Sequence, residues 1–205
     1  MEIKLKFINR SDQTQSPDVV FYQTNRATDF EELPVAWKVI KHCGFGNYHP
    51  FVFPYLSEVS ASDSYGNFTP HLACFPGQAF QVIRTASGNE LKPAGKATSV
   101  LDMELRNELV RGAINANIFK GGSLFARKTI IAPGQKAVFR FNPTLFVGAA
   151  SAVEEGAAVS SAVIGNRKQE LPLLGVRNAD LILTGGGSGP YAEPFRFTLE
   201  NIQWA

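Results

Sequence analysis

The chain has 205 residues, of which 44% are apolar, 11% aromatic and 19% charged. This composition is that of a globular protein and excludes an intrinsically disordered chain, which has fewer apolar and more charged residues. The 20 basic and 18 acidic side chains give a net charge of +2. Nucleic-acid-binding proteins instead concentrate Lys and Arg on one face, so we expect no nucleic-acid partner.

The amino-terminal residues predict a strand. Ile3, Leu5 and Phe7 share one face, and the residues between them are lysines. This period of two is typical of a strand with one buried and one solvated face. No apolar run follows a basic start, so we see no signal peptide and no transmembrane segment. We expect the chain to be cytoplasmic or exported by a non-classical route.

Residues 28–41 have two interpretations. A capping pattern at their start and helical spacing of apolar residues favour a helix. Pro34 would lie inside that helix and cost about 3 kcal/mol. Alternation of Val35, Trp37 and Val39 favours a short turn followed by a strand instead. The sequence does not separate the two.

All histidines and cysteines lie within one stretch of the chain: His42, Cys43, His49, His71 and Cys74. Imidazole and thiolate groups bind zinc, so these five residues are the metal-ligand candidates. Their spacing matches no standard zinc motif, and adjacent residues of a strand point to opposite faces. We therefore expect reduced, buried thiols, hydrogen-bonded imidazoles and no cofactor.

An aromatic segment overlaps this stretch. Alternation of Phe51, Phe53 and Tyr55 favours a core-facing strand, and Pro50 and Pro54 keep it away from central strands. Exposed tyrosine or histidine at such an edge would instead contact a sugar, a lipid or a partner protein. The candidate ligand-binding residues are Tyr48, His49, Tyr55, Tyr65 and Trp37.

Further strands are predicted at residues 19–23, 51–59, 71–75, 80–84, 116–120, 124–131, 137–141, 144–147, 181–184 and 195–199. The turn clusters between them are spaced for antiparallel hairpins and are too short for repeated βαβ crossovers. The glycine-rich residues 185–190 lead into a strand, which favours a hairpin over a phosphate loop. The fold class is all-β and mainly antiparallel: a β-sandwich or partly closed barrel with at most one or two short helices.

We expect a single β domain over residues 1–205, with a degenerate duplication into halves of about 1–97 and 98–205 as the alternative. Leu5–Asn9 and Met103–Asn107 both place an asparagine at the end of an alternating strand. Two Pro-Gly-Gln turns, at 76–78 and 133–135, both precede aromatic strands. Because Pro-Gly presets a tight turn, reuse of turn chemistry explains this second pair equally well.

The sequence contains no nucleophile elbow and no cofactor motif, so we name no catalytic residue. We expect a non-catalytic β-sandwich module that recognises a protein, glycan or lipid surface, or that self-associates as a homo-oligomer. One alternative is a metal- or Cys/His-dependent enzyme that uses the residues at 42–74. The other is a membrane-active, pore-forming-like protein in which residues 148–162 insert.

Overall fold

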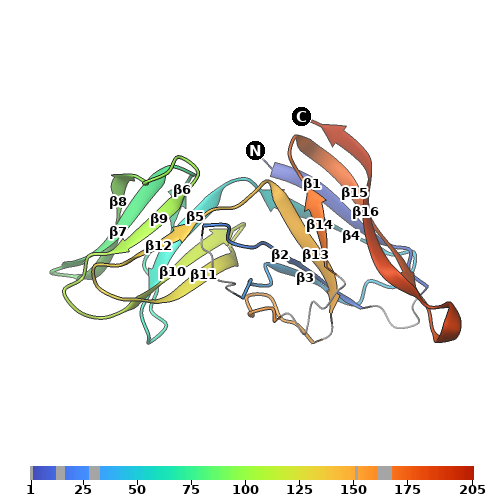
Figure 1. Cartoon of the computed structure of the whole chain (residues 1–205), viewed down its shortest axis with the longest axis horizontal. Helices are drawn as coiled ribbons and strands as arrows, with labels where there is room; N and C mark the ends of the chain where they lie inside the picture. Colours follow the sequence, from blue (N-terminus) through green and yellow to red (C-terminus); the bar gives the residue numbers. More distant parts are fainter. Residues whose placement is uncertain (1, 13–16, 28–32, 151, 161–167) are drawn as a thin grey trace. The chain divides into compact units, whose positions relative to one another are not determined.

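The structure is a computed structural model that describes residues 2–12, 17–27, 33–150, 152–160 and 168–205 (Figure 1). The described chain is nearly all β, in four mostly antiparallel sheets that form no closed barrel, which confirms the all-β prediction. Helical structure in these residues is limited to the 3-10 turn η2 (Gly189–Tyr191). None of the helices described has the length and hydropathy needed to cross a lipid bilayer.

The strands, in chain order, are β1 (Glu2–Asn9), β2 (Asp18–Tyr22), β3 (Lys38–Ile40), β4 (Tyr48–Pro54), β5 (Ser57–Ser62), β6 (Leu72–Cys74), β7 (Gln78–Thr85), β8 (Gly88–Lys96), β9 (Met103–Asn107), β10 (Ile114–Lys120), β11 (Ser123–Ile131), β12 (Lys136–Phe139), β13 (Thr144–Ala150), β14 (Gln169–Pro172), β15 (Val176–Gly186) and β16 (Glu193–Trp204).

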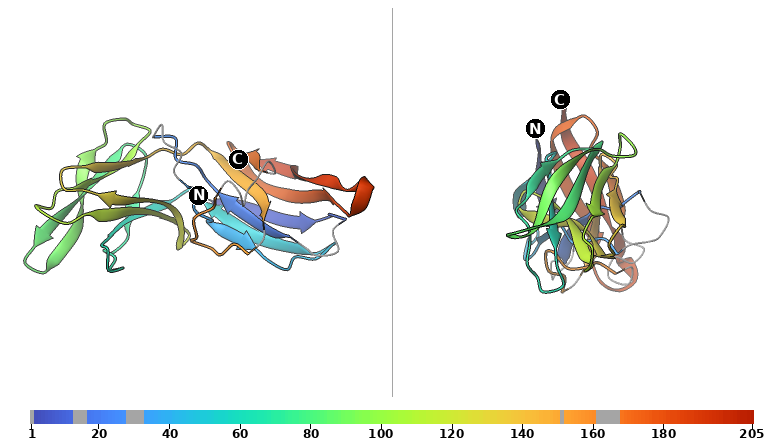
Figure 2. Two further views of the ribbon diagram at one scale, coloured as in Figure 1. Left: turned by 60° about the horizontal axis from the view of Figure 1, so that its bottom comes forward. Right: turned by 90° about the vertical axis from the view of Figure 1, so that its left-hand side faces the viewer.

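The chain divides into two compact units. Unit 1 comprises Met1–Gln23, Leu33–Tyr55 and Pro143–Ala205, and unit 2 comprises Thr24–Glu32 and Leu56–Asn142. Each unit contains two four-stranded sheets. The colours of Figures 1 and 2 show that unit 1 joins blue amino-terminal strands to orange and red carboxy-terminal strands, whereas the middle of the chain forms unit 2.

Unit 1 is a sandwich of the sheets β16-β15-β1-β4 and β14-β13-β2-β3. Strand β1 runs parallel to β15 and antiparallel to β4. Its predicted apolar face is buried, because Ile3, Leu5 and Phe7 are all at most 2% exposed. Across the sandwich the ring of Phe21 lies 4.8 Å from that of Phe51, so aromatic side chains of both sheets form the core.

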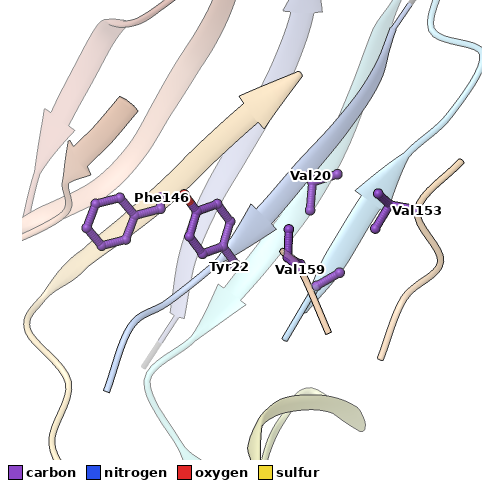
Figure 3. Packing of buried hydrophobic residues seen from close by; sticks show 6 residues of the cluster. Val20, Tyr22, Phe146, Val153 and Val159 are labelled. Carbon is purple, nitrogen blue, oxygen red and sulfur yellow. The ribbon is translucent and has the colours of Figure 1, made fainter. Parts of the chain in front are cut away.

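Unit 1 also has an apolar layer outside the β14-β13-β2-β3 sheet (Figure 3). Its buried members are Val20, Tyr22, Ala36, Phe146, Val153 and Val159. Residues 152–160 cover this face, and the Val159 N–H donates to the Pro34 carbonyl oxygen at 2.7 Å. This segment belongs to residues 148–162, which we considered as a membrane-inserting stretch; residues 151, 161 and 162 lie outside the described part.

Unit 2 is a second sandwich, formed by the sheets β11-β10-β5-β6 and β12-β9-β7-β8. Leu105, Ile118 and Phe125 are fully buried between them. The Phe125 and Phe141 rings meet edge to face with centroids 5.0 Å apart. The alternating residues of β9 and β10 therefore supply this core as the sequence pattern predicts.

One prediction about an individual element is wrong, and one open alternative is decided. The single strand expected at residues 51–59 is wrong, since β4 ends at Pro54 and β5 begins at Ser57. For residues 28–41 the strand interpretation holds over the described part: Val35 forms a bridge with Ala158, and β3 follows it. Residues 28–32 lie outside the described residues.

The prolines of the strands mark sheet edges. Pro50 and Pro54 lie in β4, which is an edge strand as the sequence predicts. Pro93, Pro172 and Pro194 lie in β8, β14 and β16, which are edge strands too. A proline removes one ladder hydrogen bond, and an edge strand tolerates this loss. Strand β2 lies between β13 and β3, so it offers no free edge.

Candidate functional site

The five metal-ligand candidates do not converge. His42, Cys43 and His49 belong to unit 1, and His71 and Cys74 belong to unit 2. Within the described ranges, no three His, Cys, Asp or Glu side chains stand close enough to hold a metal ion.

Both cysteines are buried free thiols. Burial raises the pKa of Cys74 to about 12, and its Sγ atom lies 3.5 Å from Met103 Sδ. Burial also raises the pKa of Cys43. A thiol that stays protonated at neutral pH is a poor nucleophile, so neither cysteine has the environment of a reactive thiolate.

The histidines make local contacts. The His71 ring stacks on Phe119 with centroids 4.2 Å apart, and its Nδ1 atom lies 3.5 Å from Glu58 Oε2. Burial and the nearby Lys38 ammonium lower the pKa of His49. Both of these imidazoles therefore lie near charged side chains, Glu58 for His71 and Lys38 and Glu155 for His49.

The predicted ligand-binding residues lie in different parts of the structure. Trp37 is only 3% exposed, and its ring meets that of Phe53 edge to face at 5.2 Å, so it belongs to the core. Tyr65 is 90% exposed in the loop between β5 and β6 of unit 2. Tyr48 and Tyr55 are exposed at the two ends of β4 in unit 1.

The strongest candidate site is the outer face of the β16-β15-β1-β4 sheet. Because residues alternate in direction along a strand, the residues between the buried ones point to this face. We call it the polar sheet face and define it by Lys4, Lys6, Pro50, Val52, Asn178, Asp180, Asn201 and Gln203.

The polar sheet face is hollowed. A groove of about 520 Å³ is lined by all of its residues together with parts of Leu5, Phe51 and Ala179. A second hollow of about 480 Å³ is lined by Glu2, Tyr55, Val176, Arg177 and Ala205. Lys4 and Asn178 line both, so the two hollows adjoin along β1 and β15. The first hollow is shallow and open to solvent.

Hydrogen bonds fix the polar groups of this face. The Asp180 carboxylate accepts from Asn201 Nδ2 at 2.7 Å and lies 3.0 Å from Lys6 Nζ. Burial alone would raise the pKa of Asp180, but the bonds from Asn201 and Lys6 outweigh it and lower that pKa. Asn178 Nδ2 donates to Gln203 Oε1 at 2.6 Å. These bonds therefore link side chains of β1, β15 and β16 across the face.

Two aromatic rings flank the polar sheet face. Tyr48 begins β4 and is 67% exposed, and Tyr55 directly follows β4 and is 39% exposed. Seven residue steps of largely extended chain lead from one to the other, which corresponds to about 23 Å. The face is thus an elongated surface with a tyrosine at each end.

In unit 2, the outer face of the β12-β9-β7-β8 sheet carries a cluster of charged residues. Glu104 points outward from β9, yet its side chain is fully buried. It lies 2.8 Å from Lys136 Nζ and 3.0 Å from Arg106 Nη2, and it accepts from the Thr98 N–H at 2.9 Å. On this face an ion-pair network surrounds the buried Glu104 carboxylate.

The sequence did not identify the amides of the polar sheet face. Asn178, Asn201 and Gln203 lie on the solvated side of β15 and β16, where polar residues are expected in any exposed sheet. Only the pairing of these strands brings them beside Lys4 and Lys6.

Comparison of the chain with protein-family models, with curated proteins and with solved structures finds no match.

Proposed function

We propose that the chain is a non-catalytic binding module and that its polar sheet face binds a glycan chain. The observation that carries this proposal is the groove of about 520 Å³ with its hydrogen-bonded amides and charges, on a sheet face whose edge strand β4 has Tyr48 at its start and Tyr55 just after its end. None of the five His and Cys candidates lines this groove.

The chemistry of the face matches that of a sugar. Each sugar hydroxyl both donates and accepts hydrogen bonds, as does a side-chain amide. The Asn178 carbonyl oxygen and the Gln203 amino group keep hydrogen-bonding capacity, since their mutual bond uses only one donor and one acceptor. Val52 and the Pro50 ring provide apolar surface for the C–H faces of a sugar ring.

A glycan fits this face better than a lipid or a protein. A lipid surface requires a contiguous exposed apolar patch, whereas a Lys6–Asp180 ion pair occupies this face. The centre of a protein–protein interface is depleted of charged residues. Polar groups fixed beforehand on strands lower the entropic cost of binding a flexible chain.

The test is a screen of the whole protein against a panel of neutral and acidic oligosaccharides, followed by calorimetry on the best binder. Asn178→Ala and Tyr55→Ala should each weaken binding about tenfold, since one lost hydrogen bond or ring contact is worth about 1–1.5 kcal/mol. Tyr65→Ala in unit 2 is the matched control, because this tyrosine is 90% exposed and lies outside the face. No binding in the screen, or an equal loss in Tyr65→Ala, would contradict the proposal.

A further inference from the structure

The strand pairings repeat with a shift of eight strands. In the first half of the chain β1 pairs with β4, β2 with β3, β5 with β6 and β7 with β8. In the second half β9 pairs with β12, β10 with β11, β13 with β14 and β15 with β16. Adding eight to each number in the first set gives the second set.

The remaining pairings join the two halves and obey the same rule. Strand β1 pairs in parallel with β15, and β9 pairs in parallel with β7. Strand β2 pairs antiparallel with β13, and β10 pairs antiparallel with β5. Each unit therefore contains four strands from each half of the chain.

Single hydrogen bonds repeat as well. The Asn9 N–H donates to the Asn47 carbonyl oxygen, and the Asn107 N–H donates to that of Gln135. The Gly46 N–H donates to the backbone carbonyl oxygen of Asn9, and the Gly134 N–H donates to that of Asn107. Asn9 and Asn107 are the last residues of the two similar sequence segments, Leu5–Asn9 and Met103–Asn107.

A second pair of equivalent bonds lies at the other end of each half. The Ala97 N–H donates to the Gly77 carbonyl oxygen at 2.8 Å, and the Ala205 N–H donates to that of Gly175 at the same distance. Gly77 thus corresponds to Gly175, and Gly134 corresponds to Gly46. The two Pro-Gly-Gln turns therefore occupy different positions of the repeat, and their likeness reflects turn chemistry alone.

We propose that residues 1–97 and 98–205 are two copies of one eight-strand module that complete each other by exchanging four strands. The interaction partner that this arrangement fits is a second copy of the same chain. If residues 1–97 of one chain pair with residues 98–205 of another, every strand keeps its native neighbours. Such an exchange needs no new interface and is a low-cost route to oligomers.

The connection between β4 and β5 in the first half favours strand exchange. Only Tyr55 and Leu56 join β4 to β5. The three residue steps from Pro54 to Ser57 span at most about 11 Å, and packed sheets lie about 10 Å apart. The connection therefore has almost no slack for turning β5 back beside β2, in the sheet opposite β4. Short connections of this kind promote strand exchange.

The connection between the halves is the place to test this. Residues 97–102 join β8 to β9, and Val100 and Leu101 are 82% and 58% exposed. A specific protease site inserted between Val100 and Leu101 allows the folded protein to be cut into its halves. The uncut insertion protein, with an unchanged elution volume and circular dichroism spectrum, is the control.

The cut protein should elute at the volume of the uncut one and separate into two fragments only in denaturant. Two half-sized species under native conditions would mean that each half folds on itself and would overturn the proposal. This measurement involves no refolding, so it decides the question even if refolding is inefficient.

Partner choice is tested by mixing two cut proteins, one with an amino-terminal affinity tag and one isotope-labelled. After joint unfolding and refolding, about half of the carboxy-terminal fragments captured through the tag should carry the label. If the tagged amino-terminal fragments are captured with no carboxy-terminal fragment bound to them, the proposal is overturned. Glycan binding is not measured in either experiment, so their outcome is independent of the proposed function.

Discussion

Glu104 combines full burial with three charged or polar partners in unit 2. Burial raises its pKa, but the hydrogen bonds from Lys136, Thr98 and Arg106 outweigh this and lower it from 4.5 to about 2. The folded state therefore binds this proton more weakly than the unfolded state. The stabilisation is complete above about pH 4.5 and is lost as the pH falls toward 2.

Replacing Glu104 with Gln should lower the free energy of unfolding by about 2 kcal/mol at pH 7, because Lys136 and Arg106 lose their carboxylate. Urea titrations at several pH values measure the gap between the two proteins. The gap should narrow as the pH falls from 4.5 toward 2, because the carboxylate binds a proton near pH 4.5 in the unfolded state but only near pH 2 in the folded state. If the difference in unfolding free energy between the two proteins stays constant over this range, Glu104 does not have the lowered pKa described above.

Lys120 is a buried amine in β10 that faces the thiol of Cys74 and the Phe125 ring. Burial lowers its pKa from 10.5 to about 8. The unfolded state thus binds more protons between these pH values, and the stability contributed by this group rises with pH across that window. The Cys74 thiol, with a pKa of about 12, does not titrate there.

The Lys120→Met variant should be more stable than the wild type at pH 7, by about 2–3 kcal/mol. It should also lack the rise in unfolding free energy between pH 8 and 10. Lys96→Met, at the exposed end of β8, serves as the control and should change neither quantity. If both variants show the wild-type pH dependence, Lys120 is charged and solvated in the folded protein.

At the scale of elements, the turns after β1 and β9 depend on one buried asparagine each. Asn9 Nδ2 donates to the Cys43 carbonyl oxygen at 2.7 Å, and its Oδ1 accepts from the Ser11 N–H. Asn107 Nδ2 donates to the Ile131 carbonyl oxygen at 2.8 Å, and its Oδ1 accepts from the Leu109 N–H. The same side chain therefore joins the same two backbone segments in both units.

Asn9→Ala and Asn107→Ala should each lower the free energy of unfolding by about 2–3 kcal/mol, because buried backbone groups lose their partners. Thermal and denaturant unfolding measure this, with the exposed Asn89→Ala as the control. Losses below about 0.5 kcal/mol, the size of a surface substitution, would contradict the structural role.

The layer outside β2 and β13 includes a tyrosine, Tyr22. The Tyr22 hydroxyl is buried and has no hydrogen-bond partner among the described residues. Tyr22→Phe removes that unsatisfied group and should raise the free energy of unfolding by about 1 kcal/mol. Phe146→Ala, whose ring stacks on Tyr22 at 5.5 Å, should instead cost about 3 kcal/mol. A loss of stability in Tyr22→Phe would show that the hydroxyl has a partner.

Local pattern predicted most strands but not all of them. The sequence pattern does not predict strand β8. Leu91 is its only buried residue, so buried and exposed residues do not alternate along it. Strand β14 is 4 residues long, too short to show a period, and β3 was predicted as only one of two interpretations of its segment. The border between β4 and β5 was missed because apolar residues continue on both sides of it.

At the scale of the whole molecule, the sequence could not predict which strands pair. The ladder between β1 and β15 joins residues more than 170 positions apart, and no local pattern encodes such a partner. For the same reason, Tyr48 and Tyr55 were identified as candidates but the amides beside them were not. The asparagines that end β1 and β9 are visible in the sequence as a repeated feature, because each makes the same side-chain hydrogen bonds in a buried turn.

The polar sheet face as a glycan site is the central claim of this account. Its most direct test is a two-dimensional NMR titration of the isotope-labelled protein with the best-binding oligosaccharide. We predict that the amide signals of Lys4, Asn178 and Gln203 shift most, and that those of unit 2 stay in place. Shifts concentrated around Tyr65 in unit 2, or no shifts at saturating oligosaccharide, would contradict the claim.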